Sequence, residues 1–512
     1  MTEEITGNNP NNSWILSIIV ILIGGFMAIL DSSIVNVAIP SLMTDFGVTS
    51  AEIEWIVTVY MLTLGVIVPT SGWLGDYLGY KRLYILSLGV FTLGSLLCSL
   101  AWDVGSLSIF RVIQGLGGGM IMPITMAMVY RIVPRERIGS AMGTFGLTML
   151  LAPAIGPSLG GYLVEYVSWH WIFSINVPIG VIGILLAGIV IPDFPKTPAG
   201  KFDWRGALLA ATGLFCLLFA FSEGSEWGWS SYPTVMLFYI SLAALGIFVY
   251  WELSIEEPLL DLTLFRYGTF AMGNLMLALI TIGMFSGVFF IPLFLQSIRG
   301  LGAFQTGLLM LPPALVSALV MPISGRLYDK IGPKPLITSG ILILAYSTYL
   351  FTKLDIYTEL TTIIQWNVVR SIGMGLTMMP TQTAIMSVVP NEKVGRASSI
   401  TNIINRVSGS FGIAILTVML NHRQTYHSTM LNWNISSYNL QMFLQNSVQE
   451  AGNLSQSVIS GLLQGNIYKI SFVQALNDVF LIMSVLMFMA FFPAFTLKKG
   501  DASTGTQHNL GE

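Results

Sequence analysis

Charge is scarce in this chain. Only 10% of its 512 residues are Asp, Glu, Lys or Arg, the formal net charge is -3, and 54% of the residues are hydrophobic. Soluble globular proteins carry about 25% charged residues, so the composition excludes an ordinary soluble domain. The small negative net charge gives none of the basic footprint on which nucleic-acid binding depends, and no nucleic-acid partner is expected.

Cysteine and histidine are also rare. The two cysteines, Cys98 and Cys216, lie in apolar runs, where they are expected as buried small hydrophobes rather than as a disulfide framework. The four histidines are scattered without metal-ligand spacing, so no metal or other cofactor is expected. The chain lacks G-x-x-x-x-G-K-[ST], the phosphate-binding sequence of many ATP-driven pumps. It also lacks a signal-peptide pattern, and its first apolar run is expected to be a retained helix.

Apolar runs, by contrast, recur along almost the whole chain. Runs of about 20 residues are long enough to cross a bilayer, and they do so as helices because lipid offers no partner to an unpaired backbone group. Fourteen transmembrane helices are predicted, at 14–38, 53–74, 82–101, 106–130, 138–164, 168–192, 204–222, 234–252, 270–298, 302–323, 335–352, 358–380, 396–420 and 471–496.

The distribution of Lys and Arg orients these helices. With the N-terminus in the cytoplasm, only Arg299, Lys353, Arg423 and Lys469 fall in external segments, and only Arg111, Arg370 and Arg406 fall inside the helices. The rest of the 23 basic residues fall in cytoplasmic segments. Because basic residues stay on the cytoplasmic side, both termini are predicted to be cytoplasmic.

The chain repeats itself at offsets of 253 to 259 residues. "GWLGDYLGYK" at 72–81 matches "GRLYDKIGPK" at 325–334, "VPRERIGSA" at 133–141 matches "VPNEKVGRA" at 389–397, and "RVIQGLGGGM" at 111–120 resembles "RSIGMGLTMM" at 370–379. Parallel six-helix repeats are a transporter architecture in which substrate binds between the halves.

The predicted fold is therefore all-α and integral to the membrane, with two six-helix halves and two inserted helices. The predicted segments are a cytoplasmic N-terminal tail (1–13), the first half (14–192), the insert with its linkers (193–269), the second half (270–496) and a cytoplasmic C-terminal tail (497–512). The second half includes a long external loop at 421–470.

These motifs resemble those of the major facilitator superfamily. The fourteen-helix count, with "LDSSIVNVAIP" in the first helix, resembles the drug:proton antiporter branch of EmrB/QacA type. The resemblance covers nearly the whole chain. It implies export of small amphipathic compounds in exchange for protons across the plasma membrane, by alternating access. In relatives from double-membrane bacteria it also implies a periplasmic adaptor, which would dock on the 421–470 loop. The alternatives are a lipid or metabolite exporter of the same fold, or a membrane enzyme or receptor.

The first repeated motif lies between the second and third predicted helices. Its glycines permit tight turns, and its aspartate can cap a helix or pair with a cation. The resemblance implies that this segment latches the two halves in the outward-facing state. The latch residues are Gly72, Asp76, Gly79, Lys81 and Arg82. The candidate partners are the helix end near Gly395, Arg131 or Arg137 for Asp76, and Glu136 for Lys81 and Arg82. The simpler interpretation of Lys81 and Arg82 is topogenic charge.

The fifth predicted helix contains "APAIGPSLGGYL" at 152–163. Proline removes a backbone hydrogen bond, and small residues let a neighbouring helix approach closely. The matched region near Gly412 lacks the proline, which favours a special element over ordinary packing. The resemblance implies that the motif marks antiporters. Its residues are Pro153, Gly156, Pro157, Gly160 and Gly161.

Asp31 is an acid inside the first apolar run. Counted from the external helix ends, Asp31 and Arg111 lie at comparable depths of about 8–14 Å, so they are expected to pair or nearly so. Burial favours a neutral carboxyl and a nearby arginine favours the carboxylate, so a group poised between them can bind and release a proton. We expect Asp31 to carry the proton and Arg111 to tune it, with Gln114 and Asn36 as polar neighbours. The alternative is a structural ion pair.

A substrate cavity is a further hypothesis. Methionine and aromatic residues suit sites that accept many apolar ligands, although they are also common in membrane helices. The candidate cavity residues are Asn36, Gln114, Met120, Phe285, Phe289, Arg370 and Arg406. Asp478 is expected to neutralise Arg406 as a structural pair rather than to act as a proton site.

Overall fold

The computed structural model describes residues 13–194, 200–434 and 456–497. Every regular element in these ranges is a helix, which confirms the all-α prediction. Thirteen of the described helices are long and apolar enough to cross a membrane. The remaining predicted span, at 358–380, is α13 (Leu360–Ser387), which has 28 residues but carries Gln365, Asn367 and Arg370, which make it less apolar.

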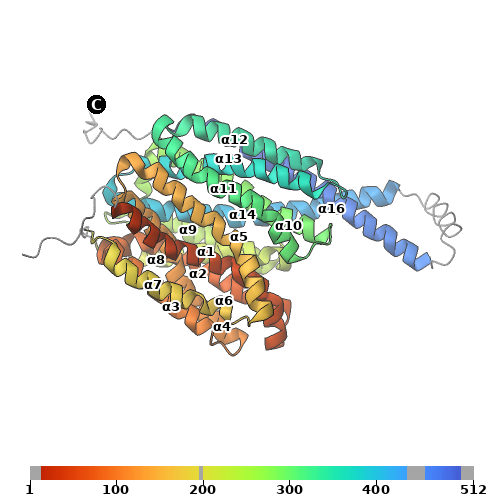
Figure 1. The fold of residues 1–512 in the computed structure, drawn as a ribbon, viewed down its shortest axis with the longest axis horizontal. Helices are drawn as coiled ribbons and strands as arrows, with labels where there is room; N and C mark the ends of the chain where they lie inside the picture. The colour runs from red at the N-terminus through yellow and green to blue at the C-terminus, as the bar shows by residue number, and fades with distance from the viewer. Residues whose placement is uncertain (1–12, 195–199, 435–455, 498–512) are drawn as a thin grey trace, which may run out of the picture.

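The helices form two halves with a helical pair between them (Figure 1). The first half comprises α1 (Ser13–Phe46), α2 (Ser50–Leu78), α3 (Tyr80–Cys98), α4 (Val104–Ile132), α5 (Ile138–Tyr166), α6 (Trp171–Ser174) and α7 (Asn176–Val190). The insert comprises α8 (Trp204–Trp227) and α9 (Tyr232–Ser254). The second half comprises α10 (Gly268–Ser297), α11 (Ala303–Ile331), α12 (Pro333–Leu350), α13, α14 (Val394–Asn434), α16 (Gln456–Met489) and α17 (Phe491–Ala494). Short 3-10 turns lie at Arg135–Arg137, Leu262–Arg266, Phe351–Lys353 and Asn391–Lys393.

The repeated motif forms the same turn in both halves. Gly79 separates α2 from α3 with φ 88°, and Gly332 separates α11 from α12 with φ 79°. Residues with a side chain rarely adopt a positive φ, whereas glycine adopts it freely. The matched glycines therefore explain why two long helices reverse direction over a single residue in each half.

The polar segment predicted as a loop at 421–470 is helical on both sides of residues 435–455, which lie outside the described residues. α14 continues past its predicted end to Asn434, and α16 begins at Gln456. The two helices pack against each other and extend beyond the rest of the bundle (Figure 1). Packing between two helices can stabilise them outside the lipid. The pattern of apolar runs could not reveal these extensions, because they are polar. We call this end of the bundle the hairpin end.

The opposite end is the basic end, at which α2, α4, α11 and α13 finish and α3, α5, α12 and α14 begin. There the halves touch closely. A Cβ on Gly139 of α5 would clash with the carbonyl of Gly325 in α11, and the Ser71 and Ser399 hydroxyls lie 2.9 Å apart across the α2–α14 contact. The insert lies along this seam, because α8 packs on both α2 and α14. The two predicted tails fall almost entirely outside the described residues.

Candidate proton-coupling site

Asp31 and Arg111 meet inside the first half. Asp31, in the middle of α1, is 0% exposed, and Arg111, on α4, is 1% exposed. The Arg111 Nη1 donates to Asp31 Oδ2 at 2.5 Å. Lone buried charges are costly, and such a pair is tolerated only when further hydrogen bonds satisfy its remaining atoms.

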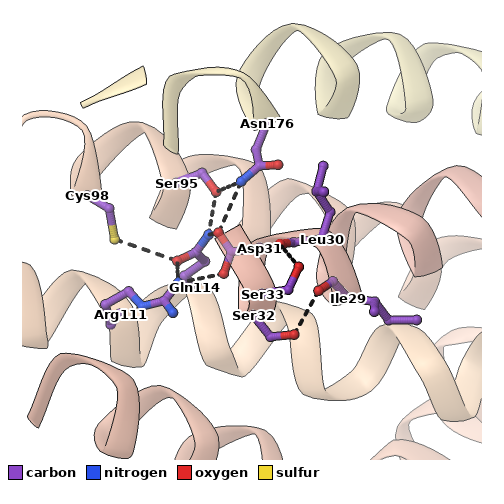
Figure 2. A network of polar contacts seen from close by, with 10 residues as sticks. All are labelled: Ile29, Leu30, Asp31, Ser32, Ser33, Ser95, Cys98, Arg111, Gln114 and Asn176. Atoms are coloured by element: carbon purple, nitrogen blue, oxygen red, sulfur yellow. Dashed lines mark hydrogen bonds and ion pairs between the residues drawn. The ribbon is translucent and has the colours of Figure 1, made fainter. Parts of the chain in front are cut away.

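Those further hydrogen bonds involve residues of α3, α4 and α7 (Figure 2). Asp31 Oδ1 accepts from Gln114 Nε2 at 2.8 Å and from Asn176 Nδ2 at 3.1 Å. Both amides also donate to the Ser95 hydroxyl, at 2.5 and 3.3 Å. Gln114 Oε1 in turn accepts from Arg111 at 2.7 Å. The carboxylate thus accepts hydrogen bonds from three donors, which satisfy its buried oxygens.

An aromatic wall covers the arginine. The Arg111 guanidinium lies 3.8 Å from the centroid of the Tyr60 ring and 5.5 Å from that of Phe173. Such cation–π contacts stabilise a desolvated cation. The Tyr60 hydroxyl is buried and interacts with the Asp31 carboxyl group, so Tyr60 belongs to the same network.

The polar residues that follow Asp31 have other roles. The Ser32 and Ser33 hydroxyls donate to the α1 backbone, at Ile29 and Leu30 (Figure 2). Asn36 is exposed and, in the described part of the chain, makes no hydrogen bond to Asp31 or Arg111, so the expectation that it neighbours Asp31 is wrong. Of the two expected polar neighbours, the structure brings only Gln114 to the carboxylate.

The glycine-rich segment of α5 packs against α1 beside Asp31. A Cβ on Gly156 would collide with the Ser33 hydroxyl, and one on Gly160 would lie 2.7 Å from Ile34 Cγ1. Gly161 has more room, with its nearest neighbour at 3.9 Å. Pro153 and Pro157 lie within the same helix. Gly156 and Gly160 therefore allow α5 to approach the turn of α1 that carries Asp31.

The sequence profile of the Major Facilitator Superfamily matches residues 21–413. The chain belongs to the Major Facilitator Superfamily. It is 35% identical over 93% of its length to the uncharacterized MFS-type transporter YhcA of Bacillus subtilis, covering 91% of that protein. It is 34% identical over 80% of its length to the Multidrug resistance protein B homolog of Mycobacterium tuberculosis, covering 77%. It is 32% identical over 84% of its length to the lincomycin resistance protein LmrB of Listeria monocytogenes, covering 91%.

Solved structures agree on the fold. The human organic anion transporter MFSD10 superposes with a TM-score of 0.63 at 13% identity, over 94% of this chain and 99% of that one. The proton:xylose symporter XylE superposes with a TM-score of 0.58 at 13% identity, over 94% and 96%. The chain is therefore a multi-pass membrane protein with the major facilitator fold, as predicted, and its named relatives are transporters.

Within this superfamily member, Asp76 lies at the α2–α14 contact and is 4% exposed. It accepts from the Tyr80 hydroxyl at 3.1 Å and pairs with Arg131 at 3.7 Å and Arg396 at 3.9 Å. Of the candidate partners, Arg131 pairs with Asp76, and so does Arg396, which follows Gly395 at the start of α14. Asp76 contacts the start of α14 through the Arg396 side chain, so this contact is an ion pair and not a helix cap.

The predicted pairing of Lys81 and Arg82 with Glu136 is wrong. Lys81 lies 3.7 Å from Asp193, which is 85% exposed, because α7 returns to the basic end beside α3. The second copy of the motif supplies the helix cap instead. Asp329 accepts from the backbone N–H groups of Gly139 and Ser140, at 3.0 and 3.2 Å, at the start of α5.

The second-half arginines also differ from expectation. Asp478 pairs with Arg423 and His427, both at 2.7 Å, so its predicted pairing with Arg406 is wrong. Arg423 lies roughly 25 Å beyond Arg406 along α14, at about 1.5 Å per residue. The error follows from the unexpected length of that helix. Arg370 is 4% exposed and donates to backbone carbonyls of α10.

The structure describes the surroundings of two of the three remaining cavity candidates. Met120 is partly buried against the core of the bundle. Phe289 is 42% exposed and packs its ring on Phe290. The Phe285 side chain lies outside the described residues. The substrate cavity stays a prediction.

Proposed function

We propose that this superfamily member exports small amphipathic organic compounds in exchange for protons, by alternating access between its two halves. Relatives named for multidrug or lincomycin resistance, at 32–34% identity over most of their length, support the export of drugs. Because some of these relatives are named for resistance to several drugs, we favour a class of compounds as substrates over a single metabolite.

One observation carries the proton coupling, namely the network around Asp31. A carboxylate at 0% exposure depends on Arg111, Gln114 and Asn176 for its charge. These donors come from α4 and α7, so a small shift of either helix relative to α1 removes a donor and favours uptake of a proton. Return of the donor expels the proton. Such a group exchanges protons in step with helix movement, as an antiporter requires.

The basic end is proposed to face the cytoplasm, with the protein in the plasma membrane and both termini inside. The excess of Lys and Arg at this end supports that orientation. The close contacts of Gly139 with Gly325 and of Ser71 with Ser399 then lie on the cytoplasmic side. The structure accordingly corresponds to a state closed toward the cytoplasm. In an organism with two membranes, the hairpin end is the surface on which a periplasmic adaptor would dock.

Transport by inside-out membrane vesicles tests the proposal. With an acid-inside pH gradient, vesicles containing the protein should accumulate a fluorescent amphipathic dye above its external concentration, and collapsing the gradient should release it. One proton crossing 100 mV supplies about 2.3 kcal/mol, enough for roughly 50-fold accumulation. Accumulation that needs ATP and ignores the gradient would refute proton coupling, and no accumulation of any member of a chemically broad panel would refute export.

A further inference from the structure

A hollow of about 560 Å³ lies at the basic end, where the two halves meet. Its walls come from the start of α1, the start of α5 with the preceding turn, and the last turns of α11. Trp14 and Ile15 form an apolar wall. The lining residues are Trp14, Ile15, Glu136, Arg137, Ser140, Arg326, Asp329 and Lys330.

Three of the lining side chains are cations that pair with no other side chain in the described part of the chain. Arg137, Arg326 and Lys330 are exposed, and no hydrogen bond or ion pair joins their side chains to another residue in the described ranges. Of the two acids, Asp329 is engaged by the N–H groups of Gly139 and Ser140. Glu136 is the other negative group. The three cations therefore outnumber the acids, and one of those acids is already occupied.

The location decides what kind of anion fits. The hollow lies at the ends of membrane helices, where interfacial tryptophans and basic residues meet lipid headgroups. An anionic phospholipid offers a phosphate to the cations and acyl chains to Trp14 and Ile15. Basic pockets between membrane helices on the cytoplasmic side bind such headgroups. We propose that this hollow is a binding site for the headgroup of an anionic phospholipid.

The site spans both halves. Arg137 belongs to the first half, whereas Arg326 and Lys330 belong to the second. Directly beneath them α5 and α11 touch at Gly139 and Gly325. A phosphate bound by cations of both halves bridges this contact, so anionic lipid should stabilise the closed basic end. Ordinary topogenic charge predicts no such preference for these three positions over other basic residues at the same end.

Native mass spectrometry of the purified full-length protein tests the site, with phosphatidylglycerol and phosphatidylcholine of identical acyl chains as probes. The first variant is Arg326→Gln/Lys330→Gln, and Arg137→Gln removes the cation of the other half. Lys201→Gln/Arg266→Gln is the charge-matched control, because both residues are exposed at the basic end outside the hollow. Each lost cation should weaken binding about 5-fold, hence about 25-fold for the double variant.

The expected result is preferential binding of phosphatidylglycerol that weakens in both test variants and persists in the control. Unchanged helical circular dichroism shows that a variant is folded. Equal binding of the two lipids to the natural protein would overturn the proposal, as would equal losses in the test and control doubles. Displacement of phosphatidylglycerol by inorganic phosphate would also overturn it, because it would indicate a simple anion site.

Discussion

Arg370 donates a hydrogen bond to the backbone carbonyl of Gly283 at 3.1 Å. Arg111 donates to the Asp31 carboxylate at the corresponding place in the first half. The arginines match in the internal repeat, and aligning Pro40 with Pro292 sets Gly283 opposite Asp31. A carbonyl accepts a hydrogen bond but does not take up a proton at physiological pH. Both halves keep the cation, and among the described residues the first half alone pairs it with a titratable acid, so we expect proton coupling to reside in the first half.

The contact between α1 and α5 yields the first prediction. Gly156→Val/Gly160→Val should push α5 away from the turn of α1 that carries Asp31, because even a Cβ at either position meets Ser33 or Ile34. We expect export to be lost, or protons to leak without substrate, as measured with a pH-sensitive dye inside reconstituted vesicles. Gly161→Val is the matched control, since its nearest neighbour is 3.9 Å away. If the double variant still exports with tight proton coupling, Gly156 and Gly160 serve only ordinary helix packing.

Asp76→Asn should weaken the closed state of the basic end. The change removes the charge that faces Arg131 and Arg396 and accepts from the Tyr80 hydroxyl, and a hydrogen bond to a charged group contributes about 1.5–3 kcal/mol. The ratio of closed to open molecules should therefore fall roughly 10- to 100-fold. A cysteine introduced as Asn36→Cys reports the change, because Asn36 is exposed and both native cysteines are buried.

Labelling of that cysteine by a membrane-impermeant maleimide should slow in the Asp76→Asn background. Asp193→Asn is the control, because it removes only the exposed partner of Lys81 and should leave the labelling rate unchanged. If Asp76→Asn and Asp193→Asn label at the same rate, Asp76 does not act as a latch.

The linker after α9 carries a pH-dependent contact. Asp261 pairs with Lys393 at 2.6 Å, next to the start of α14. Burial alone would raise the pKa of Asp261, but the hydrogen bonds from Lys393 and Thr263 outweigh burial and hold it below its usual range. The stability from this pair is therefore present above the ordinary aspartate pKa of about 3.9. It is lost as pH falls through the lower pKa of the folded protein.

Lys393→Gln should accordingly lower the melting temperature in detergent by about 1–2 °C near neutral pH. The effect is small because the lysine is 44% exposed and exposed pairs contribute at most about 1 kcal/mol. The difference from the natural protein should vanish in strong acid, once Asp261 is protonated in both. A difference that stays constant across the acid range would mean that the pair does not contribute through charge.

The sequence predicted the Asp31–Arg111 pair because depth along a helix follows from residue count. Gln114 follows Arg111 by one helical turn, so it shares the same face. Asn176, Ser95 and Tyr60 were missed. They come from other helices, and the rotation of a helix about its axis depends on packing that residue counts do not show. One feature of the sequence could have pointed to Asn176, namely that it is a polar residue inside an apolar run.

The long-range ion pairs were predicted less well. Asp478 was assigned to Arg406 because α14 was expected to end at residue 420, and helices that support each other outside lipid carry no apolar signature. The pairing of Lys81 with Asp193 depends on where α7 returns, which the motif itself does not specify. The repeated turns at Gly79 and Gly332, by contrast, follow from local chemistry and were predictable.

Substrate-induced proton release from Asp31→Asn protein tests the central claim most directly. Asparagine keeps the size and accepts hydrogen bonds from Gln114 or Asn176, but it cannot carry a proton. The measurement adds a transported dye to purified protein in weakly buffered detergent and records the pH change, with dye binding followed in parallel by fluorescence polarisation. The account predicts that the natural protein releases protons on binding and that Asp31→Asn binds dye without releasing any. Proton release by Asp31→Asn equal to that of the natural protein, or pH-driven uphill export by that variant in vesicles, would contradict it.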